Sequence, residues 1–303
     1  MSPGMGERPT VLVTGWSGFI GRRLVRRLAE GLRARDGRLA LLVRKEQTLK
    51  ARAELLDLGV PGDVLEGDIA QMHLGLSGSE YKKIASEVTD VWHLAALYDL
   101  GADVDLIRRV NLDGTRHVLE LARSARSLAR LNHFSTAYVS GERQGVVLED
   151  ELDMGQRFNN AYEKSKFEAE KLVQEAKRDL PVTVYRPSIV VGDSRTGEID
   201  RFDGPYYLAI LLVASPVAVP LPLPGDGVAP LNVVPVDFVA DATIALGREP
   251  MAAGRTFNLT ADDDAMPLSE FLDRIAAYFR ERHRALGTAA RPVRRPVVIG
   301  PAA

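Results

Sequence analysis

Tyr162 and Lys166 are the pair of residues whose spacing most plainly allows chemistry. They lie four positions apart in a segment, Asn160 to Ala176, that reads as a helix, so both side chains are expected on one helical face. Tyrosine is a poor acid or base at neutral pH because its pKa is about 10. A nearby ammonium favours the phenolate, so we expect Lys166 to lower the pKa of Tyr162 and to allow proton exchange with a substrate oxygen.

Two hydroxyl groups end a predicted strand upstream of this helix, in the run His133-Phe134-Ser135-Thr136-Ala137-Tyr138. Thr136 is placed to hydrogen-bond a reacting carbonyl oxygen and to stabilise the charge that develops there, and Ser135 is the alternative. A purely structural interpretation stays open, in which both hydroxyls bond strand ends and Tyr162 is a partly buried aromatic residue.

A glycine-rich segment directly follows the first predicted strand and opens the first predicted helix. It reads Thr14-Gly15-Trp16-Ser17-Gly18-Phe19-Ile20-Gly21. Glycines let the backbone turn tightly and approach a pyrophosphate, and a helix N-terminus offers free N–H groups. We expect residues 15–21 to bind a dinucleotide, whose nicotinamide ribose Lys166 can then hold.

The end of the second predicted strand separates NADPH from NAD. It reads Leu42-Val43-Arg44-Lys45, and two cations suit the 2′-phosphate of NADP. Glu46 would serve the ribose of NAD instead if this strand ran further. We favour NADPH.

The third and fourth predicted strands end in residues that suit the rest of such a cofactor. Asp68, in Gly67-Asp68-Ile69, is placed to hold the adenine amino group, with Ile69 beneath the ring. Ala95 and Ala96 are small enough for the cofactor to pass close by.

These residues need a scaffold in which strand ends meet, and the first 190 residues provide that pattern. Apolar residues recur at helical spacing between apolar runs, as at Ile20, Leu24, Leu28 and Leu32. The predicted strands are Thr10–Thr14, Leu39–Val43, Asp63–Glu66, Val91–Leu94, Leu131–Thr136 and Val182–Arg186. Strands alternating with helices predict an α/β fold, a Rossmann-type doubly wound parallel sheet with its ligand crevice at the carboxyl ends of the strands.

The pattern changes after Pro187, where residues 188–234 are rich in glycine and proline. We predict a Rossmann domain of residues 8–187 plus 235–251, the latter including a helix from Val236 to Leu246. A small discontinuous substrate-binding domain then comprises 188–234 and 252–303, with a strand Thr256–Leu259 and a helix Leu268–Phe279.

Composition excludes several classes of protein. The 303 residues carry a formal charge of −2 and no cysteine, which argues against bulk nucleic-acid binding and excludes disulfides, thiolate metal sites and a cysteine nucleophile. The five histidines lack metal-ligand spacing, so we expect no metal. No signal peptide is apparent, and prolines interrupt the apolar stretch Tyr206–Pro224, so we expect a soluble, cytoplasmic protein without a transmembrane segment. The arginine-rich tail is most simply a solvated end; its members are Arg280, Arg282, Arg284, Arg291, Arg294 and Arg295.

As a set, these motifs resemble the extended short-chain dehydrogenase/reductases. The motifs are Thr14-Gly15-x-x-Gly18-x-x-Gly21, Gly67-Asp68-Ile69, His93-Leu94-Ala95-Ala96, Ser135-Thr136-Ala137 and Tyr162-x-x-x-Lys166. The resemblance implies a nicotinamide cofactor and catalysis by Thr136, Tyr162 and Lys166. It also implies that Pro187, Ser188 and Val190 border the nicotinamide, and that a homodimer can form through the helices at 104–125 and 160–177.

Within that superfamily the chain looks like the fatty acyl-CoA reductases and the thioester reductase domains of carboxylic acid reductases and peptide synthetases. The segments that carry this narrower resemblance are Gly67-Asp68-Ile69 with Leu74-Gly75-Leu76-Ser77, Ser135 to Val139, Tyr162 to Lys166, and Asn232 to Asp237. The pair Trp16-Ser17 departs from the usual small residues, and the longer C-terminal region of many acyl reductases is absent.

The resemblance implies NADPH-dependent delivery of hydride to an acyl thioester on CoA or a carrier protein, giving an aldehyde and a thiol. Tyr206–Pro224 would then line a channel for a hydrophobic chain or pack between the domains. One alternative substrate is a ketone, a sterol or a sugar nucleotide, whose diphosphate Arg195, Arg201 and Arg255 could hold. A less favoured alternative is a non-catalytic dinucleotide sensor.

Overall fold

The computed structural model describes residues 8–99, 101–200, 204–214, 222–224, 230–286 and 297–299. Contacts between Cα atoms group the chain into two units. The first comprises Met1–Ser188 and Val236–Leu259, and the second Ile189–Pro235 and Thr260–Ala303. Each unit is described by itself.

Seven parallel strands form the sheet of the first unit, in the order β11-β6-β5-β4-β1-β2-β3. Their bounds are Thr10–Thr14 (β1), Arg38–Val43 (β2), Gly62–Glu66 (β3), Asp90–His93 (β4), Arg130–Phe134 (β5), Val182–Pro187 (β6) and Thr256–Leu259 (β11). The predicted Rossmann-type sheet is confirmed. Because the chain runs outward from β1 in both directions, the crevice at the carboxyl ends of β1 and β4 is the expected ligand site.

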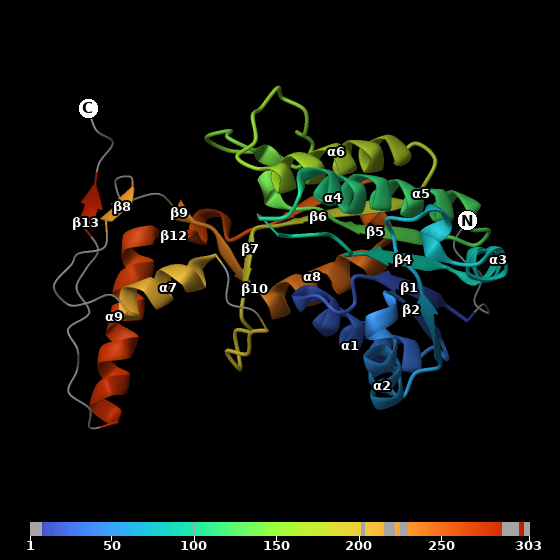
Figure 1. The fold of residues 1–303 in the computed structure, drawn as a ribbon, viewed down its shortest axis with the longest axis horizontal. Helices are drawn as coiled ribbons and strands as arrows, with labels where there is room; N and C mark the ends of the chain where they lie inside the picture. Colours follow the sequence, from blue (N-terminus) through green and yellow to red (C-terminus); the bar gives the residue numbers. More distant parts are fainter. Residues whose placement is uncertain are drawn as a thin grey trace. The chain divides into compact units, whose positions relative to one another are not determined.

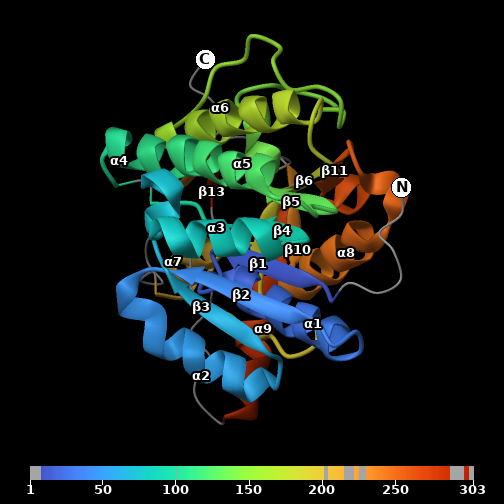
Figure 2. The ribbon, with the colours of Figure 1, turned by 90° about the vertical axis from the view of Figure 1, so that its right-hand side faces the viewer.

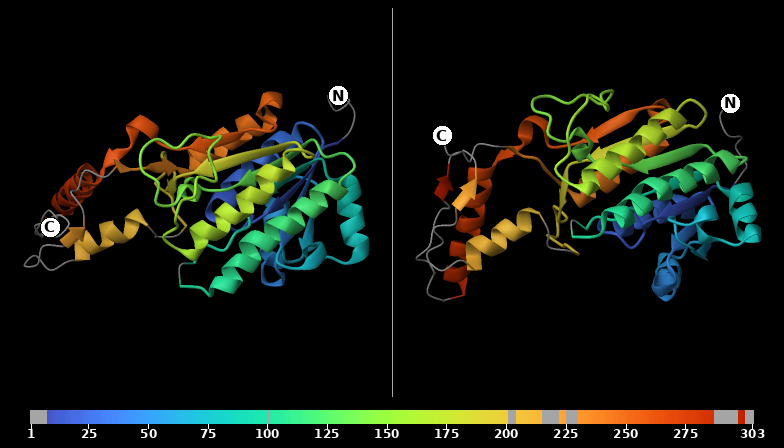
Figure 3. Two further views of the ribbon diagram at one scale, coloured as in Figure 1. Left: turned by 90° about the horizontal axis from the view of Figure 1, so that it is seen from above. Right: turned by 45° about the horizontal axis from the view of Figure 1, so that its top comes forward.

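Helices cover both faces of this sheet (Figures 1 and 2). One face carries α1, α2 and α8, and the other carries α3, α5 and α6. The bounds are Phe19–Arg33 (α1), Thr48–Leu58 (α2), Gly78–Glu87 (α3), Val104–Arg108 (α4), Gly114–Ser124 (α5), Ala161–Ala176 (α6) and Val236–Arg248 (α8). A π-helical turn, Arg109–Asp113 (η3), joins α4 to α5, and α5 lies beside α6 (Figure 3).

Short 3₁₀ turns follow several strands, and two of them flank the site described below. They are Lys45–Gln47 (η1) and Ala137–Ser140 (η4). The main core lies between the sheet and the second group of helices, where Leu12, Val91 and Leu131 pack with Ile84 and Val118. Burial of such side chains fixes the strand ends relative to the helix starts.

The position of β11 corrects the predicted domain boundary. The sequence assigned residues 252–303 to the second domain, but Thr256–Leu259 is an edge strand of the first unit. Its residues pair in parallel with β6, from Thr256 opposite Val184 to Leu259 opposite Pro187. The edge of β6 thus finds its hydrogen-bond partners in a segment that comes much later in the chain.

The second unit contains three small two-stranded sheets and two α-helices among its described residues. The strands are Ile189–Val191 (β7), Pro222–Pro224 (β8), Pro230–Leu231 (β9), Val233–Pro235 (β10), Met266–Pro267 (β12) and Val297–Ile299 (β13), and the helices are Pro205–Ala214 (α7) and Leu268–Ala285 (α9). Helix α7 packs against α9 around Leu272 and Leu208 (Figure 1). Helix α9 continues beyond the predicted Phe279.

Some predictions fall on residues that the structure leaves out. Residues 215–221 of the apolar segment, Arg201, and the tail arginines Arg291, Arg294 and Arg295 lie outside the described residues. No helix in the described part of the chain is both long enough and apolar enough to cross a membrane.

Candidate active site

The glycine loop between β1 and α1 is packed too closely for side chains at two positions. Gly15 has φ +78°, and a Cβ there would lie 2.5 Å from the backbone nitrogen of Ala95. A Cβ on Gly21 would lie 2.2 Å from the carbonyl oxygen of Gly15. Gly18 is the N-cap of α1, where no side chain caps the helix. The loop therefore presents backbone N–H groups of a helix N-terminus, which fits the pyrophosphate of a dinucleotide.

Trp16 is the unusual residue of this loop, and its side chain is packed into the protein. Its side chain is buried, and its indole N–H has no hydrogen-bond partner among the described residues. Ser17 and Gly18 form the more accessible part of the loop, and Phe19 and Ile20 begin α1. The departure from small residues is therefore accommodated inside the fold.

The cations predicted to select the cofactor directly follow β2. The strand ends at Val43, so Arg44 and Lys45 occupy its end and Glu46 lies one residue further, in η1. Arg44 Nε lies 3.0 Å from Glu46 Oε1, and both side chains are more than half exposed. Arg44 thus already holds an anion at this position, a carboxylate from its own chain.

Asp68 and Ile69 follow β3 in a tight turn. Asp68 Oδ1 accepts a hydrogen bond from the N–H of Ala70 at 2.9 Å, and Ile69 is buried. A Cβ on Gly114, the first residue of α5, would lie 2.7 Å from Ile69 Cδ1. The close approach of α5 therefore fixes the segment predicted to lie beneath the adenine.

A chain of buried hydrogen bonds runs across the strand ends through His93. The N–H of Ala95 donates to Thr14 Oγ1 at 3.3 Å, which lies 2.8 Å from His93 Nδ1, and His93 Nε2 lies 3.1 Å from Thr115 Oγ1. Thr115 donates its own hydrogen to the Asn111 carbonyl, so it accepts from His93 Nε2–H, and Nδ1 accepts from Thr14. Burial lowers the pKa of His93 to about 3, consistent with this neutral tautomer. The described residues contain no cluster of acidic and histidine side chains suited to a metal.

Asn111 extends this network to helix α6, and the sequence analysis missed it. It lies in the π turn η3, where its Oδ1 accepts from Leu97 N at 2.7 Å and its Nδ2 donates to Ser165 Oγ at 2.9 Å. Ser165 in turn donates to the Tyr162 carbonyl at 2.8 Å. The available signal in the sequence was a polar residue within an apolar helical repeat, and the structure shows that Asn111 is buried there. π turns of this kind often occur at functional sites.

The structure gives the two neighbouring hydroxyls at the end of β5 different partners. Thr136 hydrogen-bonds the Tyr162 hydroxyl and accepts from the N–H of Tyr138 at 3.3 Å. Ser135 Oγ donates instead to Glu170 Oε2 at 2.5 Å. Of the two candidates left open by the sequence, Thr136 is the one brought to Tyr162.

The predicted effect of Lys166 on Tyr162 is wrong in this structure. Burial raises the pKa of Tyr162, and the neighbouring Tyr98, whose ring lies 4.8 Å away, raises it further, while the hydrogen bond from Thr136 opposes both. Lys166 Nζ donates to the Phe134 carbonyl at 2.7 Å, and burial lowers its own pKa to about 8. Tyr162 therefore keeps its proton at neutral pH.

Side-chain caps fix where helix α6 begins and, with it, the position of Tyr162. Asn160 is the N-cap, and its side chain accepts from the N–H of Glu163 at 2.9 Å. The buried Glu163 carboxylate accepts in return from the N–H of Asn159 and from the Asn160 amide, at 2.9 and 3.0 Å. This reciprocal capping sets the first turn of the helix, to which Tyr162 belongs.

Pro187 and Ser188 lie at the carboxyl end of β6, on the same edge of the sheet as Thr136. The N–H of Ser188 donates to the Leu259 carbonyl at 3.1 Å, and its buried hydroxyl has no partner in the part of the chain that is described. Val190 belongs to the second unit, in β7, where it pairs with Val234.

Several known proteins resemble this chain in sequence and in fold. The family model described as Male sterility protein matches residues 13–243. Glycine betaine reductase ATRR from Emericella nidulans is 30% identical over 88% of this chain and 22% of its own length, and fatty acyl-CoA reductase wat from Drosophila melanogaster is 28% identical over 78% and 53%. This chain thus spans about a fifth to a half of these curated relatives. The terminal R domain from the myxalamid PKS-NRPS biosynthetic pathway superposes with a TM-score of 0.73 at 31% identity, over 85% of this chain and 67% of that one.

Proposed function

The chain belongs to the Male sterility protein family, and on that basis we propose that it reduces an acyl thioester to an aldehyde with NADPH. The observation that carries this proposal is the hydrogen-bonded pair of Thr136 and Tyr162, on the strand-end edge of the sheet that also bears the glycine loop. Fatty acyl-CoA reductase and the R domain named above support the choice of substrate.

The bound cofactor would supply a hydride to the thioester carbonyl carbon. Thr136 and Tyr162 would donate hydrogen bonds to the carbonyl oxygen, where negative charge develops. Tyr162 is suited to this direction of reaction because its raised pKa keeps the phenol protonated until the oxygen becomes basic.

The tetrahedral product of this step is a hemithioacetal. When its C–S bond breaks, the oxygen returns its proton through Tyr162, the sulfur leaves as the thiol, and the aldehyde remains. Overall, thioester, NADPH and one proton give aldehyde, thiol and NADP⁺. The chain contains no cysteine, so no thioester to the protein can form along the way.

The choice of NADPH rests on Arg44 and Lys45 at the end of β2. A 2′-phosphate would replace the Glu46 carboxylate as the partner of Arg44, gaining a second negative charge in the exchange. An acidic residue directly at the strand end would favour NAD, and Glu46 lies beyond that position.

The sugar-nucleotide alternative loses support from one of its basic residues. Arg255 immediately precedes β11, at the amino end of the strand, and its guanidinium lies over the Phe257 ring at 5.2 Å. Ligands of parallel sheets of this kind bind at the opposite edge. Arg255 is therefore not placed to hold a substrate diphosphate.

A homodimer through α4, α5 and α6 remains part of the proposal. Val104 and Leu106 on α4 are 61% and 38% exposed, which is unusual for apolar residues and is compatible with a partner surface.

The test follows NADPH oxidation and thiol release together, with a long-chain acyl-CoA as substrate. We expect both, with one NADPH per thiol if the aldehyde is released and two if it is reduced further. Tyr162→Phe should abolish turnover and retain NADPH binding, while the control Tyr81→Phe, on α3, should behave like the wild type. NADPH oxidation with an aldehyde but not with the thioester would refute acyl reduction.

A further inference from the structure

Glu170 is a fully buried carboxylate that the mechanism above leaves without a role. It lies on α6 one helical turn after Lys166, and its relative exposure is 0%. Its oxygens accept hydrogen bonds from Ser135, which directly follows β5, from Arg186 on β6 and from Gln174 on α6. Burying a carboxylate is costly unless donors surround it. The groups that donate to Glu170 therefore indicate what it holds in place.

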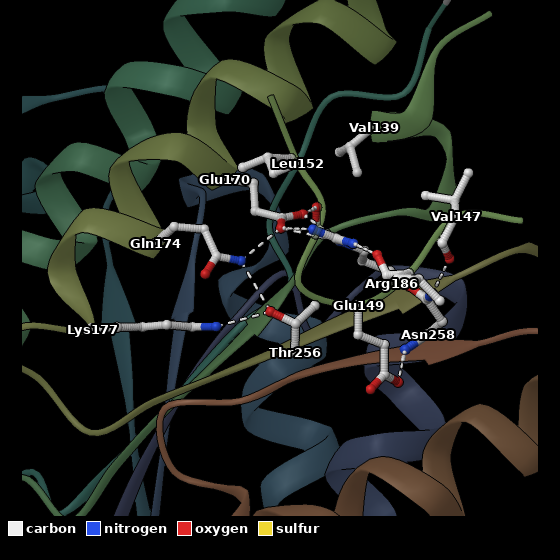
Figure 4. Close-up of polar contacts among 12 residues, drawn as sticks. Val139, Val147, Glu149, Leu152, Glu170, Gln174, Lys177, Arg186, Thr256 and Asn258 are labelled. Atoms are coloured by element: carbon white, nitrogen blue, oxygen red, sulfur yellow. Dashed lines mark hydrogen bonds and ion pairs between the residues drawn. The ribbon is translucent and has the colours of Figure 1, made fainter. Parts of the chain in front are cut away.

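Arg186 is the counter-charge of Glu170 (Figure 4). Its side chain is 1% exposed, Nη2 lies 2.7 Å from Oε1, and Nε lies 3.1 Å from both oxygens. Lys177 also lies nearby, where it donates to Thr256 Oγ1 at 2.8 Å. The Glu170 carboxylate is thus held rigidly by donors from three segments of the chain.

The first consequence concerns Ser135. A hydroxyl that donates to a buried carboxylate makes a stronger bond than it would with a neutral acceptor. The Ser135 hydroxyl therefore stays hydrogen-bonded to Glu170, while the hydroxyl of its neighbour Thr136 is hydrogen-bonded to Tyr162. Without the carboxylate, two adjacent hydroxyls would be available at the end of β5.

The second consequence concerns Lys166, which is buried among groups that do not favour its charge. His93 on β4 and His133 on β5 lie near enough to Lys166 to interact with its charge, and burial lowers the pKa of both, so they are neutral. Burial also lowers the pKa of Lys166, and Glu170 opposes that effect. The Phe134 carbonyl accepts from the ammonium but carries no charge.

We propose that Glu170 is a positioning residue of the reductase. It keeps the Ser135 hydroxyl out of the active site and favours the charged form of Lys166, and Arg186 is its counter-charge. This inference rests on the proposed function, because its two targets matter only where Thr136, Tyr162 and Lys166 act on a substrate.

Arg186 has a separate, structural contact that the test must separate from this role. Its Nη1 donates to the Leu148 carbonyl at 3.4 Å, in the loop that leads to α6. Asn258 on β11 anchors the same loop, through its N–H to Glu149 Oε1 at 2.8 Å and its Nδ2 to the Val147 carbonyl at 3.2 Å (Figure 4). Asn258→Ala thus loosens the loop and leaves the Glu170 pair intact, which makes it the matched control.

The experiment compares the pH dependence of kcat/KM in the wild type, Glu170→Gln/Arg186→Met and Asn258→Ala. Replacing both charges avoids an unpaired buried ion, and Glu170→Gln alone is the second variant if the double variant does not fold. We expect the loss of activity at alkaline pH to move to lower pH by roughly half a unit or more when the carboxylate is removed. Asn258→Ala should keep the wild-type pH profile, whatever its kcat.

A second measurement does not depend on activity. NMR with lysine labelled at Cε follows the titration of Lys166, whose signal Lys166→Arg identifies. Titration at lower pH in the carboxylate-free variants, and not in Asn258→Ala, supports the inference; unchanged titration in all variants overturns it. If the wild type reduces no thioester, the proposed function fails, and the NMR titration still decides the role of Glu170.

Discussion

Thr136→Ala and Ser135→Ala form a matched pair of substitutions, since each removes one hydroxyl from adjacent residues that are 5% and 6% exposed. The structure predicts opposite effects. Thr136 bonds the Tyr162 hydroxyl, and Ser135 bonds Glu170. Thr136→Ala should therefore reduce catalysis, and Ser135→Ala should chiefly reduce stability.

The expected magnitudes follow from these contacts. Losing one donor to a developing oxyanion lowers kcat by about 100-fold to 1000-fold, which we expect for Thr136→Ala. Its 3.3 Å contact with the Tyr138 N–H is long, so the free energy of unfolding should fall by only about 1 kcal/mol. Ser135→Ala leaves the Glu170 oxygen with Arg186 as a donor; it should cost about 1–3 kcal/mol of stability and leave kcat within roughly threefold.

The assay is the steady-state rate of NADPH oxidation with an acyl-CoA, together with urea unfolding and the dissociation constant for NADPH. Thr136→Ser, which keeps the hydroxyl, should retain most of the activity. A larger loss of kcat in Ser135→Ala than in Thr136→Ala, at equal NADPH affinity, would show that the assignment of the two hydroxyls is reversed.

Three further predictions concern the cofactor and the pH dependence. Gly15→Ala should weaken NADPH binding, followed by fluorescence, tenfold or more and destabilise the fold by about 2 kcal/mol, because the residue has φ +78° and a Cβ there would meet backbone atoms. Gly59→Ala is the control: the residue has φ +59° and lies in open space, so the substitution should cost only about 1 kcal/mol and leave NADPH binding unchanged. Glu46→Gln should tighten NADPH binding a few-fold by releasing Arg44, and Arg44→Ala should weaken NADPH binding. Neither substitution should change NADH binding. Equal effects on the two cofactors in calorimetric titrations would contradict the proposal that Arg44 binds the 2′-phosphate. Lys166 is expected to hold the nicotinamide ribose as an ammonium, and burial lowers its pKa to about 8, so kcat/KM should fall as the pH rises through about 8. A rate that stays flat to pH 10 would show that the charge is not needed.

The sheet could be predicted because strands buried on both faces read as short apolar runs, and every predicted strand from Thr10–Thr14 to Val182–Arg186 overlaps an observed one. Helix α2 was missed because it carries exposed leucines, Leu49 and Leu56, as well as the buried Leu55, so its apolar residues do not mark one face. Helix α3 was missed although Ser77 and Glu80 form a capping box, which is a local signal that could have found it.

The sequence predicts that the candidate residues meet at the strand ends, but it does not predict their electrostatics. The spacing of Tyr162 and Lys166 places both on one helical face, yet it contains no information on depth of burial or on where the lysine nitrogen points. Burial raises the pKa of Tyr162, and the Lys166 nitrogen donates to the Phe134 carbonyl, so both features change the expected electrostatics. The pairing of β11 with β6 was equally hidden, since a strand does not specify its neighbour by its own sequence.

The late position of β11 has a consequence for how the protein is made. As the chain leaves the ribosome, strands β1 to β6 emerge first, and residues 189–235 follow. Only then can α8 pack against α1 and β11 complete the sheet. Until then β6 is an open edge, with unpaired backbone groups able to recruit a strand from another chain. A truncation after Ser188 would make this transient edge permanent, so we expect it to aggregate, whereas synthesis slowed between 189 and 235 would lengthen the exposure of the same edge.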